Sequence, residues 1–393
     1  MSRRAYLDYA ATAPFDTRLA DAMAAASWAN ANALYTEGRA AANQLEDARK
    51  RIAAALGAHA PSELTFTSGG SESDNTAIRG LAKPVPGAKS THVVVSSIEH
   101  DAVLNSAKAL KSEGFVIDKI DPDASGIVRP EALQALLASI EGEGGAVTLV
   151  AVQAVNNELG TIQPVRALAR VAHAHQARFF SDAVQGLGKL DIDLEQSGVD
   201  AAAFSAHKMC GPTGIGILYG KLELLDAMDP LYLGGDSNAR FDMCGNIQLK
   251  NAPYKFESGT QPIEGIFGLH AALQYIQSIG RKNIHAWEME LHDYAIRELR
   301  RLDNIEVYNP DADTGIITFN VKNVFAQDAA TFFNANGIAV RSGQHCAKLL
   351  NNMLDTSATI RASFYLYTSY ADVDRFLDVC RRATMEACLD VFF

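Results

Sequence analysis

Short apolar runs alternate with helical patterns from about residue 43 to residue 220. The runs are rich in β-branched and aromatic residues and have the length of strands: 63–68, 91–97, 147–155, 177–183, 200–206 and 214–220. Before the first of them, Leu45, Ile52 and Leu56 recur at the spacing of one helical face. The alternation predicts an α/β fold, a mainly parallel sheet covered by helices on both sides. Ligands of such sheets bind at the carboxyl ends of the strands.

The pattern changes after Gly259. Long helical segments at 262–279 and 283–302 precede a set of shorter apolar runs and a closing helix from Ala371. The shorter runs lie near 305–309, 315–321, 338–342 and 359–364. We therefore predict a smaller α+β domain that packs closely on the large one. The predicted division is an N-terminal segment that packs with the small domain (1–12), a large domain (13–250) and the small domain (251–393).

Composition and charge limit the possible partners. The chain has 393 residues, 48% of them hydrophobic and 21% charged, which is ordinary for a globular protein. A net charge of -11, without a basic run, argues against nucleic acid and anionic membranes. The sequence shows neither a secretory signal nor a long uncharged apolar stretch, and its five scattered cysteines form no CxxC pair. We expect a cytoplasmic protein with reduced thiols and no metal site, and with small molecules and proteins as partners.

Two charged residues lie at or just beyond the ends of predicted strands. Lys208 lies between small and apolar neighbours, so it is not on a solvated face. Its ammonium could pair with a carboxylate while its stem packs on those neighbours. Alternatively, burial could lower its pKa from about 10.4, so that the amine forms a Schiff base. Asp182 could cap the following turn, or it could meet a buried cation such as the ring nitrogen of pyridoxal phosphate.

Two further strand ends carry candidate binding groups. The segment TSGGSESDN runs from a strand through glycines into a helix, which would direct backbone N–H groups of Gly70 and Ser71 at a phosphate. The segment matches neither the Walker A pattern nor GxGxxG. His100 follows the next strand and could be a structural histidine, or its ring could stack on a cofactor and move protons.

Cys346 lies in the segment IAVRSGQHCAK, beside a histidine and between Arg341 and Lys348. Gly343 allows the chain to turn just before it. On this local sequence alone, the thiol could be a buried core residue, a metal ligand, half of a disulfide or a nucleophile. A nucleophilic role would need a thiolate, whose pKa of about 8.5 a neighbouring cation or histidine would lower.

Taken together, these motifs resemble those of the cysteine desulfurases, pyridoxal phosphate (PLP) enzymes of the class V aminotransferase-like family with fold type I. The matching motifs run from LDYAATAP through TSGGSESDN, EHDAV, VNNELG, DAVQGLGK, SAHKMCGPTGIG and FESGTQP to RSGQHCA and IRASF. They cover nearly the whole chain. The first half is similar to the NifS/ISC type, whereas LGGDSNARF, APYKFESGTQP and RSGQHCAK are similar to the SUF type with its short cysteine loop.

The resemblance implies a set of residues that hold PLP. Lys208 carries it as a Schiff base and moves protons to and from the substrate. His100 stacks on the ring and assists, Asp182 pairs with the ring nitrogen, and Gln185 contacts the ring oxygen. The phosphate contacts implied are Ser71, Ser205 and His207, the backbone around Gly70, and Thr260 from the neighbouring subunit of a homodimer.

The resemblance also implies a reaction. Arg361 and Asn157 bind the carboxylate of L-cysteine, since a guanidinium fork matches two oxygens. Cys346 then takes the sulfur as a persulfide and leaves L-alanine, with Arg341 on the substrate side. A sulfur-acceptor or scaffold protein would receive the sulfur for iron–sulfur clusters or other thiolation. The alternatives are a selenocysteine lyase, an aminotransferase or C–S lyase on the same scaffold, and a non-catalytic sulfur carrier.

Overall fold

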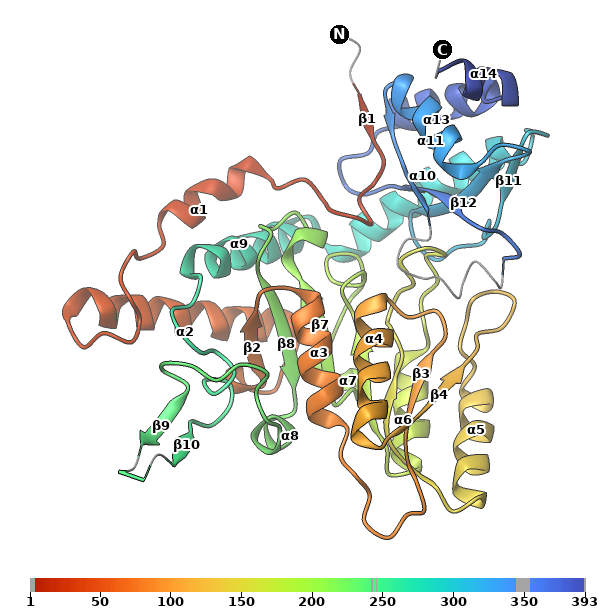
Figure 1. Ribbon diagram of the computed structural model, residues 1–393. Helices are drawn as coiled ribbons and strands as arrows, with labels where there is room; N and C mark the ends of the chain where they lie inside the picture. The colour runs from red at the N-terminus through yellow and green to blue at the C-terminus, as the bar shows by residue number, and fades with distance from the viewer. Residues whose placement is uncertain (1–3, 242, 245, 344–353, 392–393) are drawn as a thin grey trace.

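The computed structural model describes residues 4–241, 243–244, 246–343 and 354–391. The main sheet of this part of the chain has seven strands in the order β2-β8-β7-β6-β5-β3-β4 (Figure 1). The strands are β2 (Leu64–Thr67), β3 (Thr91–Ser96), β4 (Val116–Ile120), β5 (Ala146–Ala151), β6 (Arg178–Asp182), β7 (Ala201–Ser205) and β8 (Gly216–Gly220). β8 runs antiparallel to both of its neighbours, β2 and β7, and all other neighbouring pairs in this sheet are parallel. The predicted α/β class, with a mainly parallel sheet, is confirmed.

Alternate side chains of the strands enter apolar cores on opposite faces of this sheet. Val94 and Phe179 belong to one core, and Val93 and Phe180 to the other. The first core is covered by α2 (Thr36–Leu56), α5 (Pro130–Gly142), α6 (Val165–Ala174), α7 (Leu194–Ser197) and α9 (Ile263–Ile279). The second is covered by α3 (Gly70–Leu81), α4 (Asp101–Ala109) and α8 (Leu222–Ala227). Because both faces are covered, the inner strands are apolar throughout.

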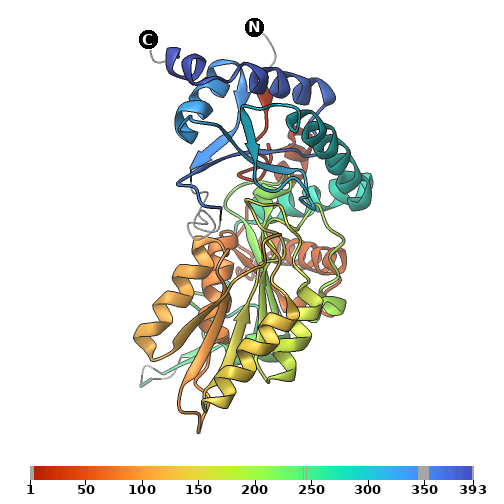
Figure 2. The ribbon, with the colours of Figure 1, turned by 90° about the vertical axis from the view of Figure 1, so that its right-hand side faces the viewer.

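The smaller sheet is antiparallel, in the order β11-β12-β15-β14. Its strands are β11 (Ile305–Val307), β12 (Ile316–Val321), β14 (Arg341–Gly343) and β15 (Thr359–Ser363). It shares an apolar core with α10 (Arg281–Leu299), α11 (Ala326–Ala335), α13 (Tyr370–Arg382) and α14 (Met385–Asp390). Figure 2 shows this C-terminal unit lying over one end of the large sheet. The N-terminal strand β1 (Ala5–Tyr6) pairs in parallel with β13 (Ile338–Ala339) of this unit.

The helix α9 packs with the large sheet rather than the small one. It contacts α2 and the short helix α1 (Ala20–Ala24), and its apolar residues join the first core of the large sheet. Ala252 and Phe256 join the second core of the same sheet. The change of texture after Gly259 therefore marks the start of long helices, not a change of packing partner. We propose that the boundary lies between α9 and α10 instead of at 250/251.

A hairpin of β9 (Asn238–Phe241) and β10 (Ile247–Leu249) projects from the large unit on the side away from the small sheet (Figure 1). None of the helices in the described part of the chain has the length and apolar character that a membrane crossing requires.

Four successive backbone carbonyls join the two units. The carbonyls of residues 157–160 follow β5 of the large sheet, and each accepts a hydrogen bond from a side chain of the small unit. The donors are Arg361 to Asn157, Thr318 to Glu158, Asn309 to Leu159 and Thr314 to Gly160. Gly160 has φ +68°, and a Cβ there would lie 2.5 Å from Thr314 Oγ1, so this position requires glycine.

A buried ion pair fixes the loop at residues 254–260 against β2. The guanidinium of Arg49 on α2 donates to both carboxylate oxygens of Glu257, each at 2.7 Å, and to the Leu64 carbonyl at 2.8 Å. The Phe66 N–H donates to Glu257 Oε1 at 2.7 Å. The side chains of Arg49 and Glu257 are 1% and 3% exposed. Removing Glu257 would leave the buried Arg49 with one longer ion pair, from its Nε to Glu46 Oε1 at 3.3 Å.

We predict that Glu257→Ala lowers the free energy of unfolding by about 3–5 kcal/mol, because the buried Arg49 loses its two short contacts and keeps only the 3.3 Å contact of its Nε with Glu46. The double variant Arg49→Met/Glu257→Leu should recover part of this loss. Urea denaturation of the single and the double variant measures the free energy of unfolding and checks the prediction. As a control, Glu113→Ala breaks an exposed pair with Arg79 and should cost at most ~1 kcal/mol. Equal losses for Glu257→Ala and Glu113→Ala would contradict the prediction.

Candidate active site

A cavity of about 210 Å³ lies at the carboxyl ends of the parallel strands and collects most of the predicted site residues. Nine of them line it: Gly70, Ser71, His100, Asn157, Asp182, Gln185, Ser205, His207 and Lys208. Asp182 ends β6 and Ser205 ends β7, while His100 follows β3 and Gly70 opens the helix after β2. Strands that run in parallel end at one edge of the sheet, so residues more than a hundred positions apart meet there.

Glycines shape one wall of the cavity. A Cβ at Gly70 would lie 2.6 Å from Val184 Cγ2, and a Cβ at Gly216 would lie 2.6 Å from the Cα of Gly69. The close contacts of residue 70 with Val184 and of residue 216 with Gly69 therefore require glycine at positions 70 and 216. α3 begins at Gly70, and its first N–H groups have no acceptor within the helix. The wall thus offers backbone donors and the positive end of a helix dipole to an anion.

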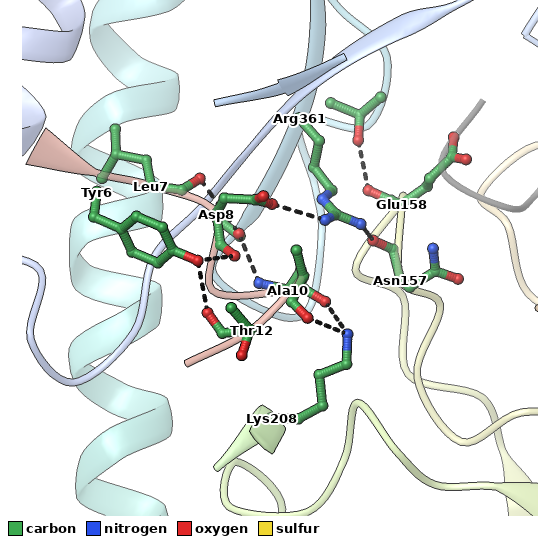
Figure 3. A network of polar contacts seen from close by, with 12 residues as sticks. Tyr6, Leu7, Asp8, Ala10, Thr12, Asn157, Glu158, Lys208 and Arg361 are labelled. Carbon is green, nitrogen blue, oxygen red and sulfur yellow. Dashed lines mark hydrogen bonds and ion pairs between the residues drawn. The ribbon is translucent and has the colours of Figure 1, made fainter. Parts of the chain in front are cut away.

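Lys208 is held by the N-terminal segment. Its Nζ donates to the Ala10 and Ala11 carbonyls at 2.6 and 2.8 Å (Figure 3). Gln185 Nε2 donates to the same Ala10 carbonyl at 2.8 Å. Burial, together with the charge of Arg361, lowers the pKa of Lys208 to about 7. Near neutral pH much of this side chain is therefore a free amine, the form that attacks a carbonyl.

Three buried acids lie around the floor of the site. Asp182 Oδ1 accepts from the Val184 N–H at 2.9 Å, and Glu99 Oε1 accepts from the Gln153 N–H at 2.8 Å. Asp74 Oδ1 lies on the cavity wall without a partner in the described residues. Burial raises the pKa of all three, and the repulsion of Asp182 adds to the rise for Asp74 and Glu99. A cation beside Asp182 would be strongly favoured here.

The two histidines of the cavity are held in defined orientations. His100 is the N-cap of α4, and its Nδ1 accepts from the Ala102 N–H at 3.1 Å. The neutral ring therefore carries its proton on Nε2. His207 Nδ1 lies 3.2 Å from Thr12 Oγ1. Burial and the charge of Lys208 lower the pKa of His207 to about 4, so this ring is neutral at physiological pH.

Arg361 lies beside the cavity and is 2% exposed. Its Nη1 donates to the Asn157 carbonyl at 2.7 Å, and its Nη2 donates to Asp8 Oδ1 at 3.0 Å (Figure 3). Desolvation lowers the pKa of Arg361, and Asp8 counteracts this shift. Glu158 is also buried here, and burial raises its pKa to about 8, with Arg361 opposing the rise.

Two of the predicted residues that the structure describes are not brought to the cavity. Thr260 is exposed on the loop after Gly259, where Asn30 Nδ2 lies 3.4 Å from its hydroxyl. Arg341 is exposed on β14, opposite Arg361 in the strand register. Cys346 lies outside the described residues.

Four residues of the site were not predicted from the sequence: Asp8, Asp74, Glu99 and Glu158. Each lies inside a motif that was recognised for a neighbour, such as Glu99 before His100 and Glu158 after Asn157. A charged residue inside an otherwise apolar or glycine-rich motif was the available signal. The described residues contain no group of three His, Cys, Asp or Glu side chains that could hold a metal ion.

Comparison with known proteins agrees with this geometry. Residues 5–376 match the family Aminotransferase class-V. The chain belongs to this family. Within the class V family it is similar to the cysteine desulfurase of Haloferax volcanii, with 36% identity over 383 residues, which cover 95% of this chain and 88% of the relative. A probable cysteine desulfurase of Halalkalibacterium halodurans is 36% identical over 343 residues, which cover 87% and 82% of the two chains.

Solved structures support the same placement. An apo cysteine desulfurase from Thermococcus onnurineus has a TM-score of 0.88 at 31% identity, over 96% of this chain and 94% of that one. The cysteine desulfurase CsdA of Escherichia coli, in an S-sulfonic acid form, has a TM-score of 0.87 at 28% identity, over 98% and 95%. The resemblance to class V cysteine desulfurases and the fold type I prediction are confirmed. Members of this family are PLP enzymes, so the class V chain is placed among enzymes of that type.

We predict that Lys208 reacts with formaldehyde and a borane reductant half-maximally near pH 7 in the cofactor-free protein, because the amine is nucleophilic only above its lowered pKa. Mass spectrometry of the modified peptide gives the rate. A synthetic peptide of residues 203–213 serves as control and should reach its midpoint near 10.4. The same profile in protein and peptide would contradict the lowered pKa.

Proposed function

We propose that this protein is a PLP-dependent cysteine desulfurase that converts L-cysteine to L-alanine and receives the sulfur on Cys346. The observation that carries the proposal is Lys208, whose pKa of about 7 places a free amine in the same cavity as Asp182 and the first residues of α3. These groups match an aldehyde, a ring nitrogen and a phosphate, the three features by which PLP is recognised.

The residues of the cavity fit PLP chemically. Lys208 would hold the aldehyde, and Asp182 would hold the protonated ring nitrogen, a cation that offsets the free-energy cost of burying the Asp182 carboxylate. Gln185 would face the ring oxygen and His100 the ring. Ser71, Ser205, His207 and the N–H groups from Gly70 onward would bind the phosphate. When bound, PLP supplies an electron sink for the substrate carbon.

The chain itself would bind the substrate and move its protons. Arg361 and Asn157 would hold the carboxylate of L-cysteine. Lys208, neutral near pH 7, would take a proton from the substrate α-carbon and return protons to the product carbon, with the Nε2–H of His100 as a second donor. The Cys346 thiolate would attack the substrate sulfur: the carbon–sulfur bond breaks and a sulfur–sulfur bond forms. L-cysteine and the thiol thus give L-alanine and a persulfide.

We predict that the PLP-loaded protein forms L-alanine and sulfide in equal amounts from L-cysteine and excess dithiothreitol. Cys346→Ala should lower this rate at least roughly a hundredfold, because the nucleophile is absent. Lys208→Ala should abolish it and the visible absorbance of bound PLP. Chromatography of the amino acid and a colorimetric sulfide assay provide the measurements. Turnover of L-cysteine by Cys346→Ala at the wild-type rate would contradict the role of Cys346.

The alternatives predict other outcomes of the same assay. A selenocysteine lyase would release L-alanine from selenocysteine far faster than from L-cysteine and would keep this activity in Cys346→Ala, since selenium leaves more readily. An aminotransferase would give a keto acid and the pyridoxamine form of the cofactor. A non-catalytic sulfur carrier would take up no PLP. A sulfur-acceptor or scaffold protein for iron–sulfur cluster assembly is the partner proposed for the persulfide.

The proposed homodimer is supported by an exposed apolar surface near Thr260. Trp28 and Leu34, between α1 and α2, are each 83% exposed, and Leu233 is 68% exposed. Residues 31–32 and Asp236 line one hollow, so these two segments are neighbours. Exposed apolar side chains gathered in this way are typical of an interface.

We predict that sedimentation gives twice the chain mass of 42.2 kDa, and that Leu34→Asp/Leu233→Asp shifts the protein toward the monomer, because both charges would be buried at the interface. Val116→Asp changes an exposed apolar residue on the far edge strand β4 and is the matched control. Dimers that persist in the double variant, or a monomeric wild type, would contradict this surface.

A further inference from the structure

The N-terminal segment from Tyr6 to Thr12 passes between the two units and contacts both charged groups that the proposed reaction uses. The carbonyls of Ala10 and Ala11 hold Lys208, and the side chain of Asp8 holds Arg361 (Figure 3). The segment is therefore part of the wall of the site, although its partners lie about 200 and 350 residues later in the chain.

Asp8 sits on a rigid turn. Its carbonyl accepts from the N–H groups of Ala11 and Thr12 at 3.0 and 3.2 Å and from the Tyr6 hydroxyl at 3.1 Å. On either side, the Leu7 carbonyl accepts from the Ser363 N–H at 2.8 Å, and the Ala10 N–H donates to Ser363 Oγ at 2.9 Å. The position of the Asp8 carboxylate is thus set by the backbone around it.

The strand β15 presents Ser363 and Arg361 to this turn. The two residues are two positions apart and therefore point to the same face of the strand. Ser363 anchors the backbone on both sides of Asp8, and Arg361 meets the Asp8 side chain. The distance between Asp8 and Arg361 is therefore fixed by strand geometry.

Arg361 is held in one plane by two acceptors on different nitrogens. Nη1 is fixed by the Asn157 carbonyl and Nη2 by Asp8. Its Nε–H is buried and has no partner among the described residues. Two fixed nitrogens orient the whole planar guanidinium, and a carboxylate needs this orientation to accept two hydrogen bonds at once.

A second buried acid, Glu158, could attract Arg361 if Asp8 is removed. Both carboxylate oxygens of Glu158 are buried without a partner in the described part of the chain. An Arg361 without Asp8 would be a buried cation with one neutral acceptor, and it would stabilise the ionised form of Glu158. The guanidinium would then be drawn toward Glu158 and away from the cavity.

We propose that Asp8 is a positioning residue that fixes Arg361 for the carboxylate of the amino-acid ligand and thereby sets its affinity. This inference rests on the proposed function, in which Arg361 receives that carboxylate. It gives the N-terminal motif LDYAATAP a role in ligand recognition that is distinct from cofactor attachment. There is a competing effect: without the negative charge of Asp8, Arg361 would attract the ligand carboxylate more strongly. This effect predicts tighter binding, and the same experiment distinguishes it.

The test compares ligands with and without a carboxylate on the full-length, PLP-loaded protein. Isothermal titration calorimetry gives the Kd of L-alanine and of ethylamine for the wild type, Asp8→Ala and Asp8→Asn. We expect Asp8→Ala to raise the Kd of L-alanine roughly tenfold, as for a lost charge-assisted contact, and to leave that of ethylamine unchanged. Asp8→Asn keeps an acceptor for Nη2, so its effect should be smaller, about threefold.

Turnover adds a second readout. In Asp8→Ala the KM for L-cysteine should rise about tenfold while kcat stays within about threefold, because ligand binding is impaired and the reacting groups are intact. Asp378→Ala removes another Asp–Arg pair, with Arg382, on the exposed face of α13 and is the matched control. It should change neither value.

Each outcome decides the inference. An unchanged or lower Kd for L-alanine in Asp8→Ala overturns it, as does an equal rise for ethylamine or a wild type that binds no L-alanine. A wild type that takes up no PLP would instead refute the proposed function, and the calorimetric comparison on the cofactor-free chain would still test Asp8. Should Asp8→Ala fail to fold, Asp8→Asn retains the test, with a rise for L-alanine alone as the expected result.

Discussion

Four backbone carbonyls, 157–160, lie between the two sheets, and buried carbonyls must find donors. The small unit supplies a side chain for each of them. Thr318 and Arg361 are direct partners in the β12–β15 register and reach the successive carbonyls of Glu158 and Asn157. The register of the small sheet is therefore tied to a loop of the large one. This constraint places the Arg361 guanidinium beside the cavity.

Electrostatics in the cavity depend on the same junction. The buried charge of Arg361 helps to lower the pKa of Lys208 and opposes the rise in the pKa of Glu158. Asp182, Asp74 and Glu99 form a buried acidic group at the site, and burial raises the pKa of each. A neutral amine and an acidic group that favours a cation suit a ligand with both an aldehyde and a protonated nitrogen. Burying these groups costs free energy, and the resulting pKa shifts are what make the site suitable for such a ligand.

Much of the fold and the centre of the site could be predicted from local sequence patterns. The inner strands are apolar because both faces are covered, and Asp182 and Ser205 stand out because they end such strands. β4 was missed, since half-buried Asp118 and exposed Lys119 interrupt this edge strand after only three apolar residues, 115–117. Asp8 could not be predicted, because its partner lies 353 residues away and no periodicity encodes that contact. The packing of α9 likewise depends on tertiary contacts rather than on its own pattern.

The N-terminal segment has a consequence for how the protein is made. Ala10 bonds to Ser363 and Asp8 to Arg361, so this segment can form these contacts only after 353 further residues have been made. Contacts of such long sequence separation form late, after the large sheet can already be complete. During synthesis the acidic group and Lys208 would exist before the wall that covers them. The emerging chain would therefore offer a more open cavity to its cofactor than the finished protein does.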